Sequence, residues 1–164
     1  MRHSLPLALI LILAFAAPAA AQPDTVILPA GSRPASAGAT DRFTGSVRVE
    51  PVIEDRTQGH TTAGRVTFQP GARSAWHTHP LGQWLWVVEG TGITQVEGQP
   101  AHLIHAGDVV WCPPNVRHWH GAARGSAMTH LSVQEALNRR NVQWLEKVTD
   151  QQYDAALASA ARHP

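Results

Sequence analysis

The sequence predicts an all-β sandwich or barrel that ends in a short helical segment. Short apolar stretches recur about every ten residues with turn-forming residues between them, which is typical of all-β domains. The expected strands are residues 47–53, 64–68, 84–88, 93–96, 102–104, 109–111 and 128–133. The turn signals between them are residues 69–71, 89–92, 97–100 and 113–115. A chain of 164 residues, 43% of them hydrophobic, is long enough for one domain with a buried core.

The first 21 residues have the pattern of a secretory signal peptide. Arg2 and His3 precede an apolar run over residues 5–17, and the alanines at 19–21 form a small-residue cleavage site. The run is shorter than the ~20 apolar residues that a membrane span needs, so an uncleaved anchor helix is the weaker alternative. We therefore expect cleavage before Gln22, export to the periplasm or the medium, and no membrane attachment afterwards.

The rest of the chain divides into three parts by composition. Residues 22–42 are rich in Pro, Ala, Gly and Ser and predict a linker or surface arm, although residues 25–28 could add an edge strand. Residues 43–135 contain the expected strands of the barrel. In the tail, residues 136–164, Asp150 opens a capped, alanine-rich helix, and residues 141–147 could form another helical turn.

Charge and cysteine content narrow the possible partners. Thirteen basic residues balance twelve acidic ones, so the chain lacks the basic excess of a nucleic-acid-binding protein. The single cysteine, Cys112, cannot form an internal disulfide and is expected to be a buried small hydrophobic residue. A small molecule is the expected binding partner.

Histidines carry the chemical signal of this sequence. His77 and His79 are two residues apart, so on a strand both side chains point to one face, and Gln83 follows with matching parity. His118 and His120 repeat the pattern about forty residues later. Buried imidazoles need partners, and a metal ion satisfies them well. The spacing therefore predicts a metal site inside the barrel.

A third strand brings further polar groups to the same face. His130 and Gln134 share one face of the strand that begins near Met128. Convergence of three polar strands is harder to explain by packing alone than a single histidine would be. The predicted site thus combines metal-competent groups with additional titratable ones.

The pattern around the first histidine pair resembles the first motif of the cupin superfamily, and a later segment is similar to the second motif. The matches to the first motif are Gly71, His77, His79, Gln83 and Gly90, and those to the second are Gly107, Pro113, Asn115 and His118. The resemblance covers roughly residues 43–135 and implies a jelly-roll barrel that holds one metal ion. Asn115 replaces the usual glycine, but asparagine also tolerates a left-handed turn.

Gln83 stands where most cupins have a glutamate. Three neutral imidazoles and an amide oxygen leave the full +2 charge on a bound metal, which makes it a stronger Lewis acid. This departure favours polar over redox chemistry. The alternative is that Gln83 marks a cupin that has lost its metal.

A narrower resemblance is to the small manganese-dependent hydroxynitrile lyases of cupin type. The similar stretches are residues 77–83, 107–111, 118–122, 127–130, 133–135 and, loosely, 144–147. The resemblance implies four metal ligands, His77, His79, Gln83 and His118. It also implies that His130 is catalytic and that Gln134 lines the pocket beside it, with Gly64 and Val66 on a facing strand. The implied cofactor is one divalent transition metal per chain, manganese first, with iron, cobalt, nickel or zinc also acceptable to these ligands.

Cyanohydrin cleavage suits this set of residues. The reaction needs the substrate hydroxyl held on a Lewis acid and its proton taken by a base, and a histidine is suited to that role near neutral pH. His130 is the expected base. His120 could instead take the proton or orient cyanide, or it could fix a ligand ring through a hydrogen bond.

Three functions therefore remain open at this point. The first is a metal-dependent lyase acting on small hydroxynitriles. The second is a periplasmic cupin that binds or senses an unknown small molecule through its metal. The third is a cupin oxygenase, which Gln83 disfavours.

Five tryptophans mostly alternate with the polar positions expected to face inward. They are Trp76, Trp84, Trp86, Trp111 and Trp119. Large apolar side chains on the outer face need cover, so we expect them to pack the outside of the barrel or to form a subunit interface. A homodimer or homotetramer is the expected assembly.

Overall fold

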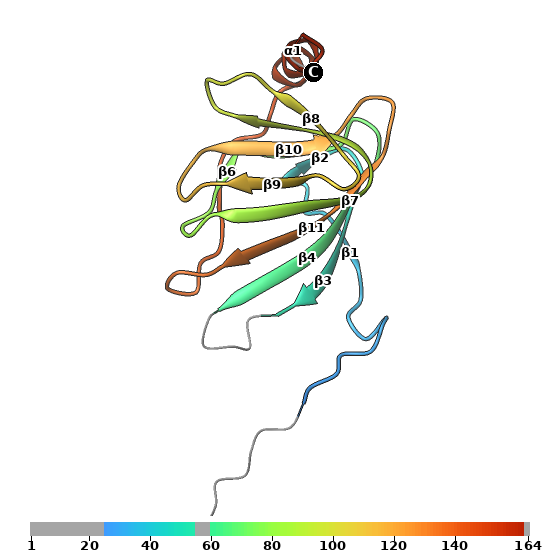
Figure 1. The fold of residues 1–164 in the computed structure, drawn as a ribbon, viewed down its shortest axis with the longest axis vertical. Coiled ribbons are helices and arrows are strands. Elements are labelled where there is room, and N and C mark those ends of the chain that lie inside the picture. The colour runs from blue at the N-terminus through green and yellow to red at the C-terminus, as the bar shows by residue number, and fades with distance from the viewer. Residues whose placement is uncertain (1–24, 55–59, 163–164) are drawn as a thin grey trace, which may run out of the picture.

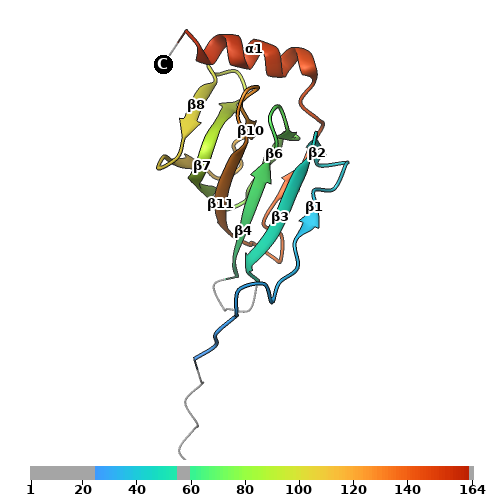
Figure 2. The same ribbon diagram turned by 90° about the vertical axis from the view of Figure 1, so that its right-hand side faces the viewer.

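Two curved antiparallel sheets and one helix make up the computed structural model of the chain, which describes residues 25–54 and 60–162 (Figures 1 and 2). The strands are β1 (Ser36–Ala37), β2 (Phe43–Thr44), β3 (Val47–Ile53), β4 (Thr61–Phe68), β5 (Arg73–Ser74), β6 (His77–Thr78), β7 (Gln83–Val96), β8 (His102–His105), β9 (Val109–Cys112), β10 (His118–Ala122), β11 (Met128–Glu135) and β12 (Gln143–Trp144), and the helix is α1 (Asp150–Ala160). The all-β prediction with a C-terminal helix is confirmed. The predicted signal peptide, residues 1–21, lies outside the described residues.

Strand β7 connects the two sheets. The neighbouring strands follow the order β1-β3-β4-β11-β7-β10-β5-β2, with β8 and β9 also paired to β7, β6 paired to β10, and β12 paired to β6. The first half of β7 pairs with β9 and β11, and its second half pairs with β8 and β10. One long bent strand therefore belongs to both sheets and curls them into a barrel.

Gly90 makes the bend in β7 possible. Its φ is +78°, a left-handed conformation that favours glycine, and a Cβ atom there would lie 1.9 Å from the carbonyl oxygen of Ala127. The sequence predicts a turn over residues 89–92, but the structure continues β7 through them. The prediction was wrong because these glycines allow a strand to change sheets rather than end.

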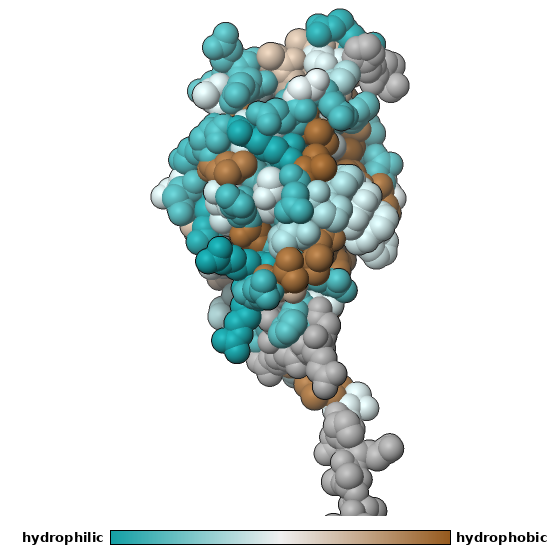
Figure 3. Space-filling view, turned by 90° about the vertical axis from the view of Figure 1, so that its left-hand side faces the viewer, coloured by the Kyte–Doolittle hydropathy of each residue, from teal (hydrophilic) through white to brown (hydrophobic). Residues whose placement is uncertain are grey.

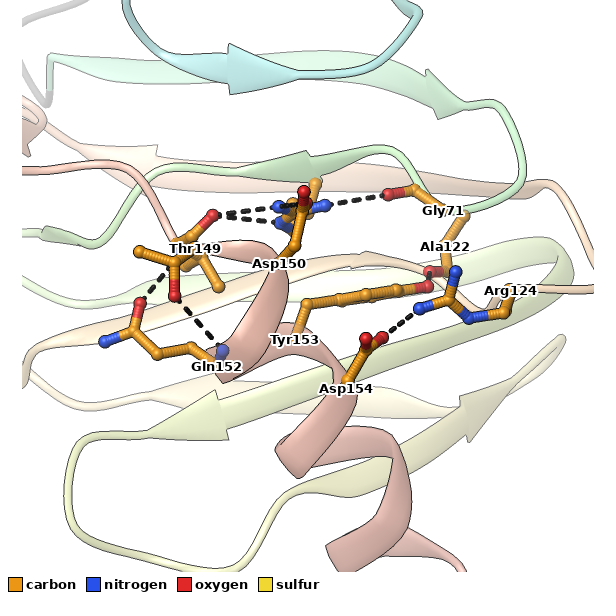
Figure 4. Close-up of polar contacts among 10 residues, drawn as sticks. Gly71, Ala122, Arg124, Thr149, Asp150, Gln152, Tyr153 and Asp154 are labelled. Carbon is orange, nitrogen blue, oxygen red and sulfur yellow. Dashed lines mark hydrogen bonds and ion pairs between the residues drawn. The ribbon is translucent and has the colours of Figure 1, made fainter.

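The helix is fixed to the barrel by a capping box and several buried contacts. Thr149 accepts a hydrogen bond from the backbone of Gln152, whose side chain accepts one from the Thr149 backbone in return. The Tyr153 hydroxyl donates to the carbonyl oxygen of Ala122 at 2.8 Å, which ties α1 to β10 (Figure 4). Figures 1 and 2 show α1 lying across one end of the barrel.

Arg73 provides the second attachment of α1. Its guanidinium is buried and donates hydrogen bonds to the Val148 carbonyl oxygen and to the Asp150 carboxylate (Figure 4). The same guanidinium lies 4.9 Å from the centre of the Tyr153 ring. The buried positive charge is therefore compensated by the Asp150 carboxylate and by the Tyr153 ring, both on α1.

Two apolar clusters form the core. One lies between the sheets, and its members are Val47, Val66, Phe68, Ala72, Val87, Ile104, Ala122 and Met128. The other lies under α1, and its members are Trp76, Ile93, Ala101, Trp119, Val148, Tyr153, Ala156 and Ala160. The inside of the barrel and the helix-covered end are therefore two distinct packing regions, joined by the hydrogen bond from Tyr153 to Ala122.

Other details of the sequence-based prediction need correction. Residues 25–28 lie in no strand, and the edge strand of the N-terminal arm is β1 instead. Residues 141–147 contain the short strand β12, which pairs with β6, and no helical turn. Asn115 has a φ of 58°, as expected for the left-handed turn.

The tryptophans divide into two groups. Trp76 and Trp119 are buried under α1, whereas Trp84, Trp86 and Trp111 are exposed on the outer face of β7 and β9. Helix α1 therefore covers only part of the outer face.

Cys112 is a buried free thiol, as expected, and burial raises its pKa to about 12. It is therefore protonated and unreactive near neutral pH. Within residues 25–54 and 60–162, no helix has both the length and the apolar character needed to cross a bilayer.

Candidate functional site

A cavity of about 280 Å³ opens into the barrel between the two sheets and is closed on one side by the N-terminal arm. Its apolar wall includes Phe43, Val49, Val66, Phe68 and Trp144. Its polar wall includes His77, His79, Gln83, His120, His130 and Gln134. The cavity thus brings apolar side chains next to most of the site residues predicted from the sequence.

Three histidines converge at the polar end. His77 lies on β6, His79 follows that strand, and His118 opens β10 directly opposite His77 in the strand register. One ring nitrogen from each lies within 4.8 Å of the others, and all three residues are buried. His118 lies behind the other two and does not line the cavity itself.

Backbone carbonyl groups fix how these three rings are oriented. In each ring Nδ1 lies in hydrogen-bonding contact with a carbonyl oxygen, so Nδ1 carries the hydrogen and Nε2 keeps its lone pair. The acceptors for His77, His79 and His118 are the carbonyl oxygens of Ala75, Asn141 and Val116. Histidines that bind metals are usually held in this way by their second nitrogen.

Gln83 adds a fourth acceptor to the same point. Its Nε2 donates to Oε1 of Gln134 at 3.2 Å, which turns Oε1 of Gln83 toward the histidines, 3.5 Å from Nε2 of His118. Nε2 of His79 has no hydrogen-bond partner among the described residues. Lone pairs that face one another without a donor are costly in a buried site, and a cation would satisfy them. The four side chains therefore fit a divalent transition metal.

Burial keeps the rings neutral, as metal binding requires. Loss of solvent lowers the pKa of His77 well below its ordinary value, with further lowering by His118 and His79. It lowers the pKa of His79 to about 4 and also depresses the pKa of His118. A neutral imidazole can offer its Nε2 lone pair without first losing a proton.

His120 and His130 lie next to this centre. The His120 ring is 5.1 Å from that of His77 and 4.9 Å from that of His130, so His120 separates the two. Nδ1 of His120 and both ring nitrogens of His130 are buried and lack hydrogen-bond partners of normal geometry among the described residues. Such unpartnered buried groups are rare and mark sites that need a ligand or a reacting atom.

Loss of solvent also lowers the pKa of His130, to about 4, and the Leu131 backbone opposes this shift. His120 is depressed further by burial and by the neighbouring rings, His130 first. Both rings are therefore neutral near pH 7 and able to accept a proton.

The structure brings together the seven predicted site residues. Gln134 lines the cavity together with His130; its Oε1 accepts from Gln83 and its Nε2 donates to Thr62. Thr62 and Asn141 are polar neighbours of the site that the sequence analysis missed. Neither belongs to a motif, and only the strand register, in which Thr62 lies opposite Gln134, could have indicated Thr62.

Comparison with known proteins identifies the family. Residues 64–133 match the cupin domain. Over 123 residues the chain is 51% identical to a protein of Granulicella tundricola named (R)-mandelonitrile lyase, and the match covers 75% of this chain and 94% of that protein. The chain is a cupin. The resemblance seen in the sequence motifs is thereby confirmed.

Solved structures support the same fold. A cupin-like protein from Thermotoga maritima superposes with a TM-score of 0.71 at 42% sequence identity, over 74% of this cupin and 92% of that chain. A cupin-2 domain protein from Rhodospirillum rubrum gives a TM-score of 0.60 at 18% identity, over 85% and 91% of the two chains. The expected jelly-roll barrel is confirmed.

Proposed function

We propose that this cupin is a metal-dependent hydroxynitrile lyase that cleaves or forms cyanohydrins such as mandelonitrile. The observation that carries the proposal is the cluster of four lone-pair atoms that faces His120 and His130 inside a cavity with an apolar wall. The similarity of this chain to a protein named (R)-mandelonitrile lyase supports the same reaction class.

His77, His79, Gln83 and His118 would hold the metal, and manganese is the expected one. When bound, a divalent ion there would act as a Lewis acid for the substrate hydroxyl. Because all four ligands are neutral, the site adds no negative charge that would weaken this effect.

The apolar wall would orient the rest of the substrate. The Phe68 ring lies 5.6 Å from that of His130 and 5.9 Å from that of His120, and Phe43 packs against Phe68. A cyanohydrin with an aromatic substituent would place its ring against this wall and its hydroxyl toward the histidines. The apolar side chains would exclude water from around this substituent.

His130 would accept the hydroxyl proton at a ring nitrogen. The bond between the carbinol carbon and the nitrile carbon then breaks, the carbonyl forms, and the electron pair leaves with cyanide. The proton on His130 passes to cyanide, so the products are an aldehyde and hydrogen cyanide. His120, between His130 and His77, would hold the leaving nitrile in place.

Cyanide release from mandelonitrile tests this function. Manganese-loaded protein should release cyanide well above free manganese and should form mandelonitrile from benzaldehyde and cyanide. His130→Ala should keep its metal but lose roughly 10²–10⁴-fold in rate, as expected for a lost general base. No release above free metal would contradict the lyase and favour a cupin that binds a small molecule.

We also propose that the protein is exported, as the N-terminal pattern predicts. Mass spectrometry of periplasmic and secreted fractions should find a chain that starts at Gln22. A full-length chain retained in the cytoplasm would contradict export.

A further inference from the structure

We propose that Thr62 and Asn141 are positioning residues that set the direction of the amide of Gln83, and that Gln134 transmits this setting rather than reacting with substrate. The inference rests on the proposed metal site. The half-buried residues Thr62, Asn141 and Gln134 form one continuous hydrogen-bonded chain to the proposed metal ligands.

The chain begins at the Thr62 hydroxyl. Its oxygen accepts hydrogen bonds from Nε2 of Gln134 and from Nδ2 of Asn141, both at 2.9 Å, and its hydrogen points to the backbone oxygen of Gln134 at 3.4 Å. A hydroxyl has two acceptor sites and one hydrogen, so all its capacity is used. The amides of Gln134 and Asn141 must therefore each turn an N–H group, and not the oxygen, toward Thr62.

The direction set at Thr62 passes along neighbouring strands. Thr62, Gln134 and Gln83 lie opposite one another on β4, β11 and β7. Because Gln134 gives its N–H to Thr62, its Oε1 faces Gln83 and accepts the Gln83 N–H at 3.2 Å. Gln83 must then present Oε1 to the histidines, which is the orientation that a metal ligand needs.

Asn141 closes the network on its other side. Its side chain donates to Thr62, while its backbone oxygen accepts the Nδ1 hydrogen of His79. One hydroxyl thus fixes two proposed ligands from separate segments, His79 after β6 and Gln83 on β7. Contacts of this kind commonly change metal affinity by about 10–100-fold.

Thr62→Val tests the inference because it keeps the side-chain shape and removes the hydroxyl. Manganese affinity, measured by titration, should fall about 10–100-fold. Thr62→Ser should restore it to within about threefold, because the hydroxyl returns. Cobalt-loaded Thr62→Val should also show an altered visible absorption spectrum, which reports ligand geometry, and thermal unfolding of the metal-free variants checks the fold.

A double-variant comparison separates orientation from general damage. In a Gln83→Glu background both oxygens of the side chain are acceptors, so no amide needs to be turned. Thr62→Val should then lower manganese affinity by less than about threefold. An equal loss in both backgrounds, or wild-type affinity in Thr62→Val, would overturn the inference while the metal site stands. Wild-type protein that binds no metal would overturn the proposed function as well.

A second proposal comes from the outer surface. On the side of the molecule in Figure 3, hydrophobic residues form separate patches among hydrophilic ones. Among the exposed large hydrophobic residues, Trp84, Trp86, Val109 and Trp111 form what we term the aromatic face. Trp84 pairs with Trp111 and Trp86 with Val109 across β7 and β9, and the Trp84 and Trp111 rings are 4.6 Å apart.

We infer that a second copy of this chain covers the aromatic face. Its tryptophans are 49%, 53% and 42% exposed, so together they present roughly 300 Å², over a third of the ~800 Å² that each partner contributes to a standard interface. A two-fold axis would stack the aromatic faces of the two copies against each other.

Sedimentation analysis of the metal-loaded protein tests this interface. The wild type should have at least twice the mass of one chain at micromolar concentration. Trp84→Glu with Trp111→Glu should give monomers, whereas Leu137→Glu, at an exposed apolar residue outside the face, should not. A monomer at every concentration, or an oligomer that survives the double substitution, would overturn the interface.

Discussion

Helix α1 covers one buried region of the barrel, and the predicted metal ligands occupy another. Under the helix, the Arg73 guanidinium and the Tyr153 hydroxyl both have partners, and the indole N–H of Trp76 is the exception. At the cavity, His79, His120 and His130 all have unpartnered ring nitrogens. Most buried polar atoms under the helix are paired within the chain. Several ring nitrogens at the cavity are not, and these could bind a ligand or a metal ion.

This difference separates stability from function. A satisfied buried network stabilises one arrangement, as the attachment of α1 does. Unpartnered buried groups lower stability and persist where a ligand or reaction uses them. Changes at the two regions should therefore have opposite signatures in metal binding and unfolding.

Removal of two histidines from the cavity should have the largest effect. His77→Ala with His79→Ala should abolish metal binding, measured by metal analysis, and with it cyanide release, because two ligands are lost. The matched control is His102→Ala with His105→Ala, which removes two exposed histidines of β8 and should leave one metal per chain. Full metal occupancy in the first variant would place the site elsewhere.

A substitution under the helix should instead lower stability and leave metal binding unchanged. Tyr153→Ala should lower the free energy of unfolding by about 3–5 kcal/mol, because a fully buried aromatic side chain is lost, while metal content stays at one per chain. Tyr153→Phe, which loses only the hydrogen bond to Ala122, should cost about 1 kcal/mol. Loss of metal from folded Tyr153→Phe protein would contradict the independence of the two regions.

The metal-free protein should lose stability in mild acid. His130 has a pKa of about 4 when folded but 6.5 when unfolded, so below pH 6.5 the unfolded chain binds more protons. Its contribution is fully present above pH 6.5 and declines by about 3 kcal/mol as pH falls to 4. Chemical unfolding across this range should show a shallower pH dependence in His130→Gln, and an unchanged one would contradict the depressed pKa.

Gln83→Glu should have the smallest effect. The carboxylate keeps the ligand geometry but lowers the charge of the loaded site by one. Manganese should bind at least as tightly, while cyanide release slows by a few-fold to about tenfold because the hydroxyl is polarised less. A faster variant would show that the charge argument is wrong.

Local signals were sufficient for much of this protein. The H-x-H pairs and the glycine and proline turns predicted the family, and the strand over residues 47–53 matches β3. Period-two spacing also predicted that His118 and His120 lie in one region, and both are buried on β10. These features depend on neighbours in sequence, which is why they could be predicted.

Long-range placement could not be predicted from the same signals. Trp119 and Trp84 each follow a predicted metal ligand, but α1 covers only Trp119. Asn141 reaches the site because β12 pairs with β6 rather than forming a helical turn. The role proposed for Thr62 depends on three strands aligned in register, which no local pattern contains.

Pulsed electron paramagnetic resonance of the manganese-loaded protein tests the central claim most directly. The account predicts one manganese ion per chain with hyperfine couplings from three imidazole nitrogens, those of His77, His79 and His118. His118→Ala should remove the signal of the bound ion. Tightly bound manganese without imidazole couplings, or no bound manganese at all, would contradict the account.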